Sequence, residues 1–425
     1  MTGPLTASSL LRQPPICNVL VAQVRDRYVE NSAGVTYNGD SLQFKRPLSN
    51  RSEVRPGMTE RTNFARFWAE FWAGATRPSL PALAGTIVVL FALTLLSVFG
   101  LDGRFIGGPG YGYVVSGPED EYGFLAAEVQ RFIHFPPEGE SVIILGSSSL
   151  REAVTGSVGL SSLLRERTGM DVEVGNLAVG GLTLWEMMAV VDRLSEAVSG
   201  VVIFEISPNF LSDDRTSMAR HAAGQRLPLY SPFLEEAVLE EGMDYPSRIG
   251  NYFLDNYRFF VSRPQSVLNA IRGPIQRRVH VAETWGTPTP AQWEAAVEQM
   301  GRWRTSYASN SEFALKILGK LVDRLRNRSL RVAFIEAVTN PDATERILST
   351  EEARVAYGAY LVDIKRFASD AGIPYWDLQE SADLAPEHFS DHSHIRIPGK
   401  RQEFTASLAE LISEHFFSST PEQSE

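Results

Sequence analysis

The stretch Val142-Ile143-Ile144-Leu145-Gly146-Ser147-Ser148-Ser149-Leu150-Arg151 decides how this chain folds. Four apolar residues end at a glycine, three serines follow, and a helix-compatible run then covers residues 150–165. This order is typical of a buried parallel strand, a tight turn and a helix amino terminus. We therefore predict that Ser148 lies above the carboxyl end of a sheet, where a helix amino terminus favours developing negative charge. Such a serine is a candidate nucleophile, although serines at this position also serve as helix caps.

Short apolar runs and amphipathic segments alternate in the rest of the chain. The apolar runs predict strands at residues 142–145, 172–174, 201–206, 332–335 and 375–378. The amphipathic segments predict helices at residues 150–165, 184–197, 351–371 and 399–417. Alternation of this kind is typical of an α/β fold, with a parallel sheet and helices on both faces. A functional site is then expected at the carboxyl ends of the strands.

One long apolar stretch, residues 80–101, contains no charged residue. A helix of this length crosses the ~30 Å hydrocarbon core of a bilayer. Arg61, Arg66 and Arg77 closely precede it, whereas only Arg104 closely follows. The positive-inside rule therefore places the amino terminus in the cytoplasm. We predict a transmembrane signal anchor in the cytoplasmic membrane, with the carboxyl-terminal domain in the periplasm or at the cell surface.

Two other interpretations of this stretch are weaker. A cleavable signal peptide is disfavoured because the segment is long and no A-x-A site follows it. A buried core helix seldom contains so long an uncharged run.

The anchor divides the chain into predicted segments. Residues 1–79 are expected to be cytoplasmic and largely disordered, because their first part is polar and rich in Pro and Gly. Our hypothesis is that translation starts at Met58, so that residues 1–57 are not part of the protein. Residues 102–140 are predicted to form a Gly-rich linker and a helix, residues 141–417 the alternating domain, and residues 418–425 a flexible tail.

Composition excludes two classes of partner or structure. The formal net charge is -11 and the sequence pI is about 5.3, with no basic stripe, so we expect no nucleic-acid partner. The single cysteine, Cys17, cannot form an internal disulfide or a cysteine-based metal cage.

An insert at about residues 211–311 separates the third and fourth predicted strands. It is expected to be helical, and it is rich in aromatic residues. Two interpretations are equally consistent with this density of aromatic side chains: a cap that binds substrate or a partner over the site, or a helical layer with its own small core.

The sequence Asp391-His392-Ser393-His394 follows the last predicted strand. Asp391 and His394 are three residues apart, so a turn or helix places them on one face. Asp391 can then orient the imidazole of His394, and His394 can take a proton from a serine. A surface turn is the commoner use of such a sequence. A zinc site formed by His388, His392 and His394 is a further alternative, but no carboxylate motif completes it.

Two further strand ends carry candidate hydrogen-bond donors. Gly181 ends the glycine pair after the second strand, and Asn209 follows the third. With the backbone N–H of Ser148, the N–H of Gly181 and the amide of Asn209 can surround one oxyanion. Each residue also has a plain structural interpretation, because glycine permits positive φ and asparagine caps helices.

This ordered set of residues resembles the SGNH (GDSL-type) hydrolase superfamily, whose blocks contribute Ser, Gly, Asn and His. Ser148, Gly181, Asn209 and the pair Asp391 and His394 match these blocks. Ser147 stands where the family usually has an acidic residue, and the third block lacks its usual glycine and aspartate. The resemblance covers about residues 141–417 and implies a flavodoxin-like three-layer sandwich.

Within the superfamily, the anchor, the Gly-Ser-Ser block and the insert look like the membrane-anchored branch. That branch includes the teichoic acid D-alanine transfer protein and the alginate O-acetylation proteins. The resemblance implies a serine esterase or O-acyltransferase with a Ser148–His394–Asp391 triad and no metal or organic cofactor. It implies an acyl donor and an envelope polysaccharide acceptor, and a membrane-bound O-acyltransferase as a partner. The alternative is a catalytically silent domain that binds polysaccharide or docks onto such an acyltransferase.

Overall fold

The computed structural model describes residues 80–100, 103–108, 117–212, 231–243 and 288–418, together with a few residues between these ranges. The chain divides into two units, Met1–Ser79 and Leu80–Glu425, and all described residues belong to the second. The predictions for residues 1–79, which include the start at Met58 and the arginines before the anchor, lie outside the described residues. Tail residues 419–425 lie outside them as well.

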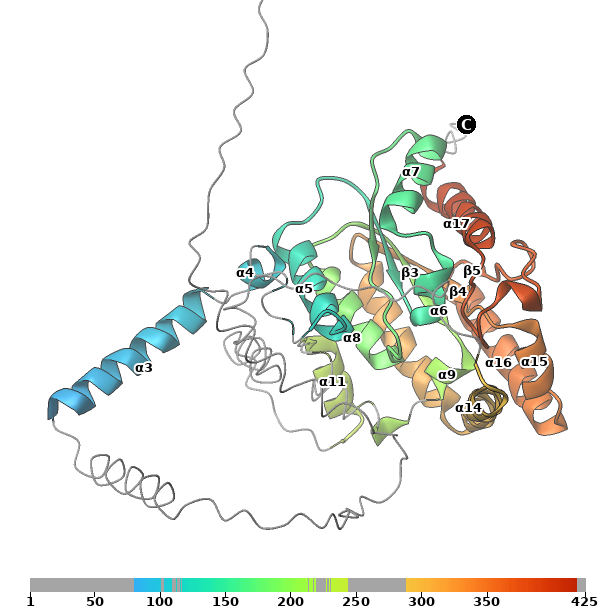
Figure 1. Ribbon diagram of the computed structural model, residues 1–425, viewed down its shortest axis with the longest axis horizontal. Coiled ribbons are helices and arrows are strands. Elements are labelled where there is room, and N and C mark those ends of the chain that lie inside the picture. Colours follow the sequence, from blue (N-terminus) through green and yellow to red (C-terminus); the bar gives the residue numbers. More distant parts are fainter. Residues whose placement is uncertain are drawn as a thin grey trace, which may run out of the picture. The chain divides into compact units, whose positions relative to one another are not determined.

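Five strands form one parallel sheet, as the alternating pattern predicts (Figure 1). The strands are β1 (Ser141–Leu145), β2 (Glu173–Asn176), β3 (Gly200–Ile206), β4 (Leu330–Glu336) and β5 (Tyr375–Trp376). Their order in the sheet is β2-β1-β3-β4-β5, which is the flavodoxin-like order. This order changes direction at β1, so the loops after β1 and β3 open next to each other.

Strand β1 shows why the sheet needs helices on both faces. Every residue of the strand is buried, and successive side chains enter different cores. Ile143 and Leu145 belong to one hydrophobic cluster, whereas Val142 and Ile144 belong to the other. Because side chains alternate across a strand, a continuous apolar run requires cover on both sides.

The helices accordingly form two layers around the sheet (Figure 1). One core is lined by α6 (Ser148–Ala153), α7 (Ser157–Thr168) and α17 (Pro398–Ile412). The other is lined by α5 (Glu121–His134), α8 (Leu184–Leu194), α11 (Pro232–Glu240), α14 (Pro290–Arg326) and α16 (Glu351–Asp370). Smaller elements are α4 (Gly103–Gly107), α9 (Pro208–Leu211), α15 (Pro341–Ile347), the 3₁₀ turn η3 (Pro386–His388) and the π-helical turn η4 (Ser413–Phe417).

The helix predicted over residues 150–165 is in fact two helices, α6 and α7. Val154 is extended and ends α6, and Gly156 precedes α7 with φ of 96° and ψ of 165°. Only glycine adopts this backbone conformation without strain. The apolar periodicity continues through the break, which is why the pattern alone does not reveal it. The break leaves Ser148 on a helix of only six residues.

The described parts of the connection between β3 and β4 are helical. Helix α9 ends where the predicted insert begins, and α11 and the first part of α14 lie within the insert. Most of the aromatic residues of the insert lie outside the described residues. Helix α14 then continues past the predicted end of the insert. It packs against α16 in the hydrophobic core on one face of the sheet.

Residues on the amino-terminal side of the domain also form helices. Helix α4 lies in the predicted linker and packs closely on α5, since a Cβ atom on Gly107 would overlap the backbone of Arg131. Helix α3 (Leu80–Gly100) coincides with the predicted anchor. Among the helices in the described residues, none meets the length and hydropathy needed to span a membrane. The anchor therefore stays a prediction.

The break between α6 and α7 gives a test with an internal control. We expect Gly156→Ala to lower the free energy of unfolding by about 1–3 kcal/mol, because alanine is strained at this φ and ψ. Gly358 lies exposed inside α16, with open space where a Cβ would be placed. Gly358→Ala should therefore raise stability by about 0.5–1 kcal/mol. Urea unfolding measures the free energy of unfolding of both variants. If the two substitutions changed it equally, the assignment of a strained break at Gly156 would be contradicted.

Candidate active site

Residues from four strand ends line one cavity of about 400 Å³. Ser148 follows β1, Gly181 follows β2, Asn209 follows β3, and His394 lies in the loop after β5. The parallel sheet places these loops at one edge, since all its strands run in the same direction. The structure thus brings together the residues that the sequence places far apart in the chain.

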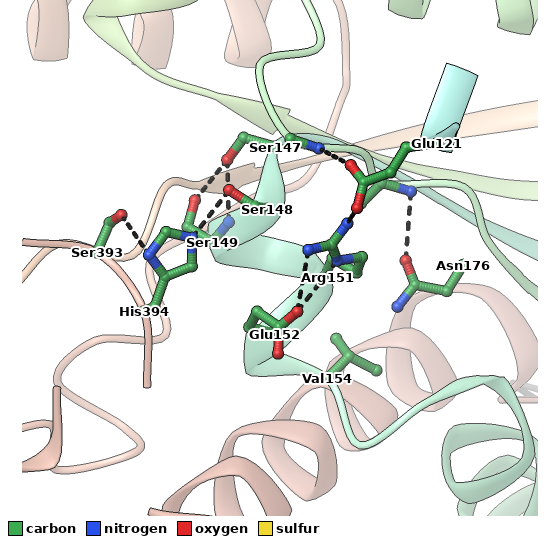
Figure 2. A network of polar contacts seen from close by, with 12 residues as sticks. Glu121, Ser147, Ser148, Ser149, Arg151, Glu152, Val154, Asn176, Ser393 and His394 are labelled. Atoms are coloured by element: carbon green, nitrogen blue, oxygen red, sulfur yellow. Dashed lines mark hydrogen bonds and ion pairs between the residues drawn. The ribbon is translucent and has the colours of Figure 1, made fainter. Parts of the chain in front are cut away.

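Ser148, His394 and Asp391 form a hydrogen-bonded relay. The Nε2 atom of His394 lies 2.8 Å from Oγ of Ser148 (Figure 2). On the other side of the ring, Nδ1 lies 2.8 Å and 2.9 Å from the two carboxylate oxygens of Asp391. A carboxylate can only accept, so Nδ1 donates to Asp391, and Nε2 can accept the proton of the serine hydroxyl. This is the geometry that proton abstraction from a serine requires.

The carboxylate of Asp391 is itself held in place. Its Oδ1 atom accepts the backbone N–H groups of Ser393 and His394, each at 2.9 Å. Burial favours the neutral form of Asp391, but the hydrogen bond and charge of His394 outweigh it and hold the pKa of Asp391 below its usual range. Asp391 is therefore ionised at neutral pH and can stabilise an imidazolium.

Ser147 and Ser148 make different contacts at the start of α6. Ser147 is the N-cap of α6, and its Oγ accepts the backbone N–H of Ser149 at 3.3 Å. Ser148 is the first residue of the helix, and its hydroxyl points to His394 (Figure 2). Ser147 therefore caps the helix, and the adjacent Ser148, which is the candidate nucleophile, faces the imidazole.

A buried glutamate forms hydrogen bonds with the turn between β1 and α6. Glu205 of β3 is fully buried, and its carboxylate accepts the backbone N–H of Ser147 and, at 2.8 Å, the hydroxyl of Ser149. A Cβ atom on Gly146 would overlap the Glu205 side chain, so the turn needs glycine there. Both residues that flank Ser148 are thus bound to one carboxyl group.

The three candidate oxyanion donors surround the same cavity. Gly181 has φ of 68°, which favours glycine, and it lines the cavity together with Asn209. The backbone N–H of Ser148 belongs to the first turn of α6, where no intrahelical acceptor is within reach. Asn176, by contrast, has a structural role, since its Oδ1 accepts the N–H of Ala178.

The three histidines of the zinc alternative are used differently. Both ring nitrogens of His394 face Ser148 and Asp391, and Nδ1 of His388 accepts the N–H of Ala385 at 2.9 Å. In the described residues no group of three His, Cys, Asp or Glu side chains could hold a metal ion. His392 lines the cavity, and burial lowers its pKa, so it is a neutral polar group there.

The insert contributes to the cavity wall and to a small core. Met300 of α14 lies in the insert and lines the cavity, as does Phe210 of α9, which precedes the insert. Met300 also packs with Ala343 and Ile347, which belong to α15. Both interpretations of the insert stay predictions, because most of its residues lie outside the described ones.

Glu205 is a residue of the site that was not predicted, although the sequence contains a signal for it. Glu205 interrupts an otherwise apolar buried strand, and a charged residue there requires polar partners. Glu121 of α5 and Arg151 of α6, which form an ion pair, had no such signal, because they come from different helices.

Solved structures resemble the chain only weakly. No protein-family model matches the chain, and no curated protein matches it. The lipase Lip_vut3 from goat rumen metagenome is 12% identical, with a TM-score of 0.30 over 64% of this chain and 97% of that chain. A carbohydrate acetylesterase family member from Sinorhizobium meliloti is 10% identical, with a TM-score of 0.27 over 65% of this chain and 98% of that chain. Both scores are too low to bear on function.

The burial of Glu205 makes stability depend on pH. Burial raises the pKa of Glu205 above its ordinary value of 4.5, against the opposing effects of its hydrogen bonds and of His394. As pH rises past 4.5, the unfolded chain loses this proton first, so stability falls until the folded carboxyl ionises too. Glutamine has no such proton. We therefore expect wild type to lose free energy of unfolding relative to Glu205→Gln as pH rises above 4.5.

Urea unfolding at several pH values measures this difference. Glu352→Gln, at an exposed position of α16, is the matched control and should follow the pH profile of wild type. If the free energy of unfolding of wild type and of Glu205→Gln changed with pH in the same way, burial would not raise the pKa of Glu205.

Proposed function

We propose that this protein is a serine esterase or O-acyltransferase of the SGNH type. The observation that carries the proposal is the unbroken hydrogen-bonded relay from Asp391 through His394 to the Ser148 hydroxyl. It opens into a cavity that three candidate oxyanion donors also line or border. General base, nucleophile and donors in one cleft are the requirements of acyl transfer.

The first half of the proposed reaction forms an acyl-enzyme. Oγ of Ser148 attacks the ester carbonyl carbon while its proton moves to Nε2 of His394. The carbonyl electron pair moves to oxygen, and the oxyanion is stabilised by the N–H groups of Ser148 and Gly181 and the amide of Asn209. The intermediate collapses, the carbon–oxygen bond of the leaving alcohol breaks, and that alcohol takes the proton from His394.

The second half regenerates the serine. Water or an acceptor hydroxyl gives its proton to Nε2 of His394 and attacks the acyl carbon. Collapse of the second tetrahedral intermediate breaks the bond to Ser148, which recovers the proton from His394. Asp391 stays ionised throughout and stabilises the imidazolium. No metal or organic cofactor takes part in these steps.

We further propose that the acyl acceptor or substrate is an envelope polysaccharide outside the cytoplasmic membrane, reached from an anchor at α3. A second cavity, of about 380 Å³, adjoins the first and shares Glu336, Ala337 and Thr339 with it. Its lining includes Tyr357, Gln379 and several carboxylates, which are groups that suit sugar hydroxyls. A substrate larger than a simple acyl ester would have room along both cavities. A membrane-bound O-acyltransferase remains the proposed partner.

The alternative of a catalytically silent domain draws on the altered first and third sequence blocks. It has less support than the enzyme, because the altered block still places Ser148 within hydrogen-bonding distance of His394.

A fluorophosphonate probe distinguishes the enzyme from the silent domain. We expect wild type to be labelled on Ser148, with the modified peptide identified by mass spectrometry, and Ser148→Ala not to be labelled, because the probe requires an activated serine. Ser162→Ala, on the exposed surface of α7, is the matched control and should be labelled like wild type. Absence of labelling in folded wild type would contradict the enzyme.

Removal of the orienting carboxylate tests the role of Asp391. We expect Asp391→Asn to lower kcat for a chromogenic acetyl ester by about two to four orders of magnitude, because the imidazole loses its tautomer and its counter-charge. KM should change little, since Asp391 does not line the cavity. A kcat within threefold of wild type would exclude a catalytic role for this pair.

Transfer and hydrolysis differ in where the acyl group of the acyl-enzyme goes, to an acceptor hydroxyl or to water. With a labelled acetyl ester, an added polysaccharide oligomer should take up label at the expense of free acetate if the protein is a transferase. Release of acetate that is unaffected by any acceptor would favour the esterase.

A further inference from the structure

The first turn of α5 holds the loop that contains Gly180 and Gly181. The hydroxyl of Tyr122 donates a hydrogen bond to the carbonyl oxygen of Gly180 at 3.0 Å. The N–H of Gly180 in turn donates to Oε2 of Glu121 at 3.1 Å. Neither Glu121 nor Tyr122 lines the catalytic cavity, so both lie behind the loop rather than within the site.

The hydrogen bond from Tyr122 to the carbonyl of Gly180 also affects the direction of the next N–H group, that of Gly181. The carbonyl of Gly180 and the N–H of Gly181 belong to one planar trans peptide unit, in which they point in opposite directions. A hydrogen bond from Tyr122 to the carbonyl therefore directs the N–H of Gly181 away from α5. Gly181 lines the catalytic cavity at a φ of 68°, and without a Cβ it offers little steric resistance to rotation of this peptide.

Glu121 is also tied to the helix that begins at the nucleophile. Arg151 of α6 forms an ion pair with Glu121 and bonds to Glu152 at 3.1 Å (Figure 2). The side chains of Arg151 and Glu152 are buried, so their loss of solvent must be offset by these charge pairs. A Cβ atom on Gly180 would lie 3.8 Å from Cβ of Ser148. The loop, the helix α6 and the first turn of α5 therefore form one connected support.

We propose that Tyr122 and Glu121 are positioning residues that aim the Gly181 N–H at the oxyanion of the acyl-transfer reaction. The inference rests on the proposed function. It assigns to α5, which precedes the strand carrying the nucleophile, a role in transition-state stabilisation. Gly180–Gly181 is the central peptide of a turn that the hydrogen bond from the N–H of Leu182 to the carbonyl oxygen of Val179 closes. Without the Tyr122 bond this central peptide can rotate within the turn, and the Gly181 donor loses its fixed direction. The Glu121 bond holds the preceding peptide, Val179–Gly180.

The decisive variant is Tyr122→Phe, which removes one hydroxyl and keeps the ring. We measure labelling by a fluorophosphonate, whose phosphoryl oxygen occupies the oxyanion position, and separate kinact from KI. One lost hydrogen bond of ~0.5–1.5 kcal/mol corresponds to a fall of up to about tenfold in kinact. KI should stay within twofold of wild type. The acidic midpoint of the pH profile of kinact should not move, because Asp391 and His394 are untouched.

Tyr307→Phe is the matched control, since the Tyr307 hydroxyl also makes a 3.0 Å hydrogen bond, to Asp363, remote from the cavity. It should keep the kinact of wild type even if it lowers the melting temperature. Glu121→Ala, which frees the N–H of Gly180, should act in the same direction as Tyr122→Phe.

The outcomes separate this inference from the function on which it rests. If Ser148→Ala abolishes labelling but Tyr122→Phe and Glu121→Ala both retain the kinact of wild type, the positioning role is overturned and the enzyme stands. If folded wild type is not labelled, or Ser148→Ala is labelled equally, the proposed function fails and the inference fails with it. A fall in kinact that Tyr307→Phe shares equally would indicate a general loss of stability and would also overturn the role.

Discussion

The hydrogen bond between Nε2 of His394 and Oγ of Ser148 joins residues 246 positions apart in the chain. It forms only if the loops after β1 and β5 open at the same edge of the sheet. Parallel pairing of all five strands provides this condition, and the apolar residues on both faces of β1 stabilise that pairing. The proposed chemistry therefore depends on the packing of the two cores as much as on the polar residues.

Hydrogen bonds from buried polar groups then fix the positions of Ser148 and His394 more closely than apolar packing does. Glu205 binds both neighbours of Ser148, and the carboxylate of Asp391 binds two backbone N–H groups besides His394. An unpaired buried carboxyl is costly, so each of these groups restricts its surroundings to the arrangement that satisfies it. The same logic applies to Arg151 between Glu121 and Glu152. A site held by such groups is preorganised before any substrate binds.

Much of the fold was predictable because strand and helix periods are local properties. All five strands were predicted, with ends within a few residues of those observed, and α8 and α16 likewise. The break at Gly156 was missed, since one left-handed residue does not disturb the apolar pattern on either side. The long helix α14 was missed in part, because its first half faces α15 and its second half faces the sheet, so no single apolar stripe runs along it.

The sequence by itself determined the class of fold and the candidates for chemistry. Ser148, Gly181, Asn209, Asp391 and His394 each follow a predicted strand, and a parallel sheet directs such residues to one edge. Tertiary structure alone decided which serine caps α6 and which faces His394, because that choice depends on the direction of side chains around a tight turn. It also decided that Glu121, Tyr122 and Glu205 support the site. Their contacts join α5, β2, β3 and α6 across the domain, and no periodicity within one segment encodes a contact between segments.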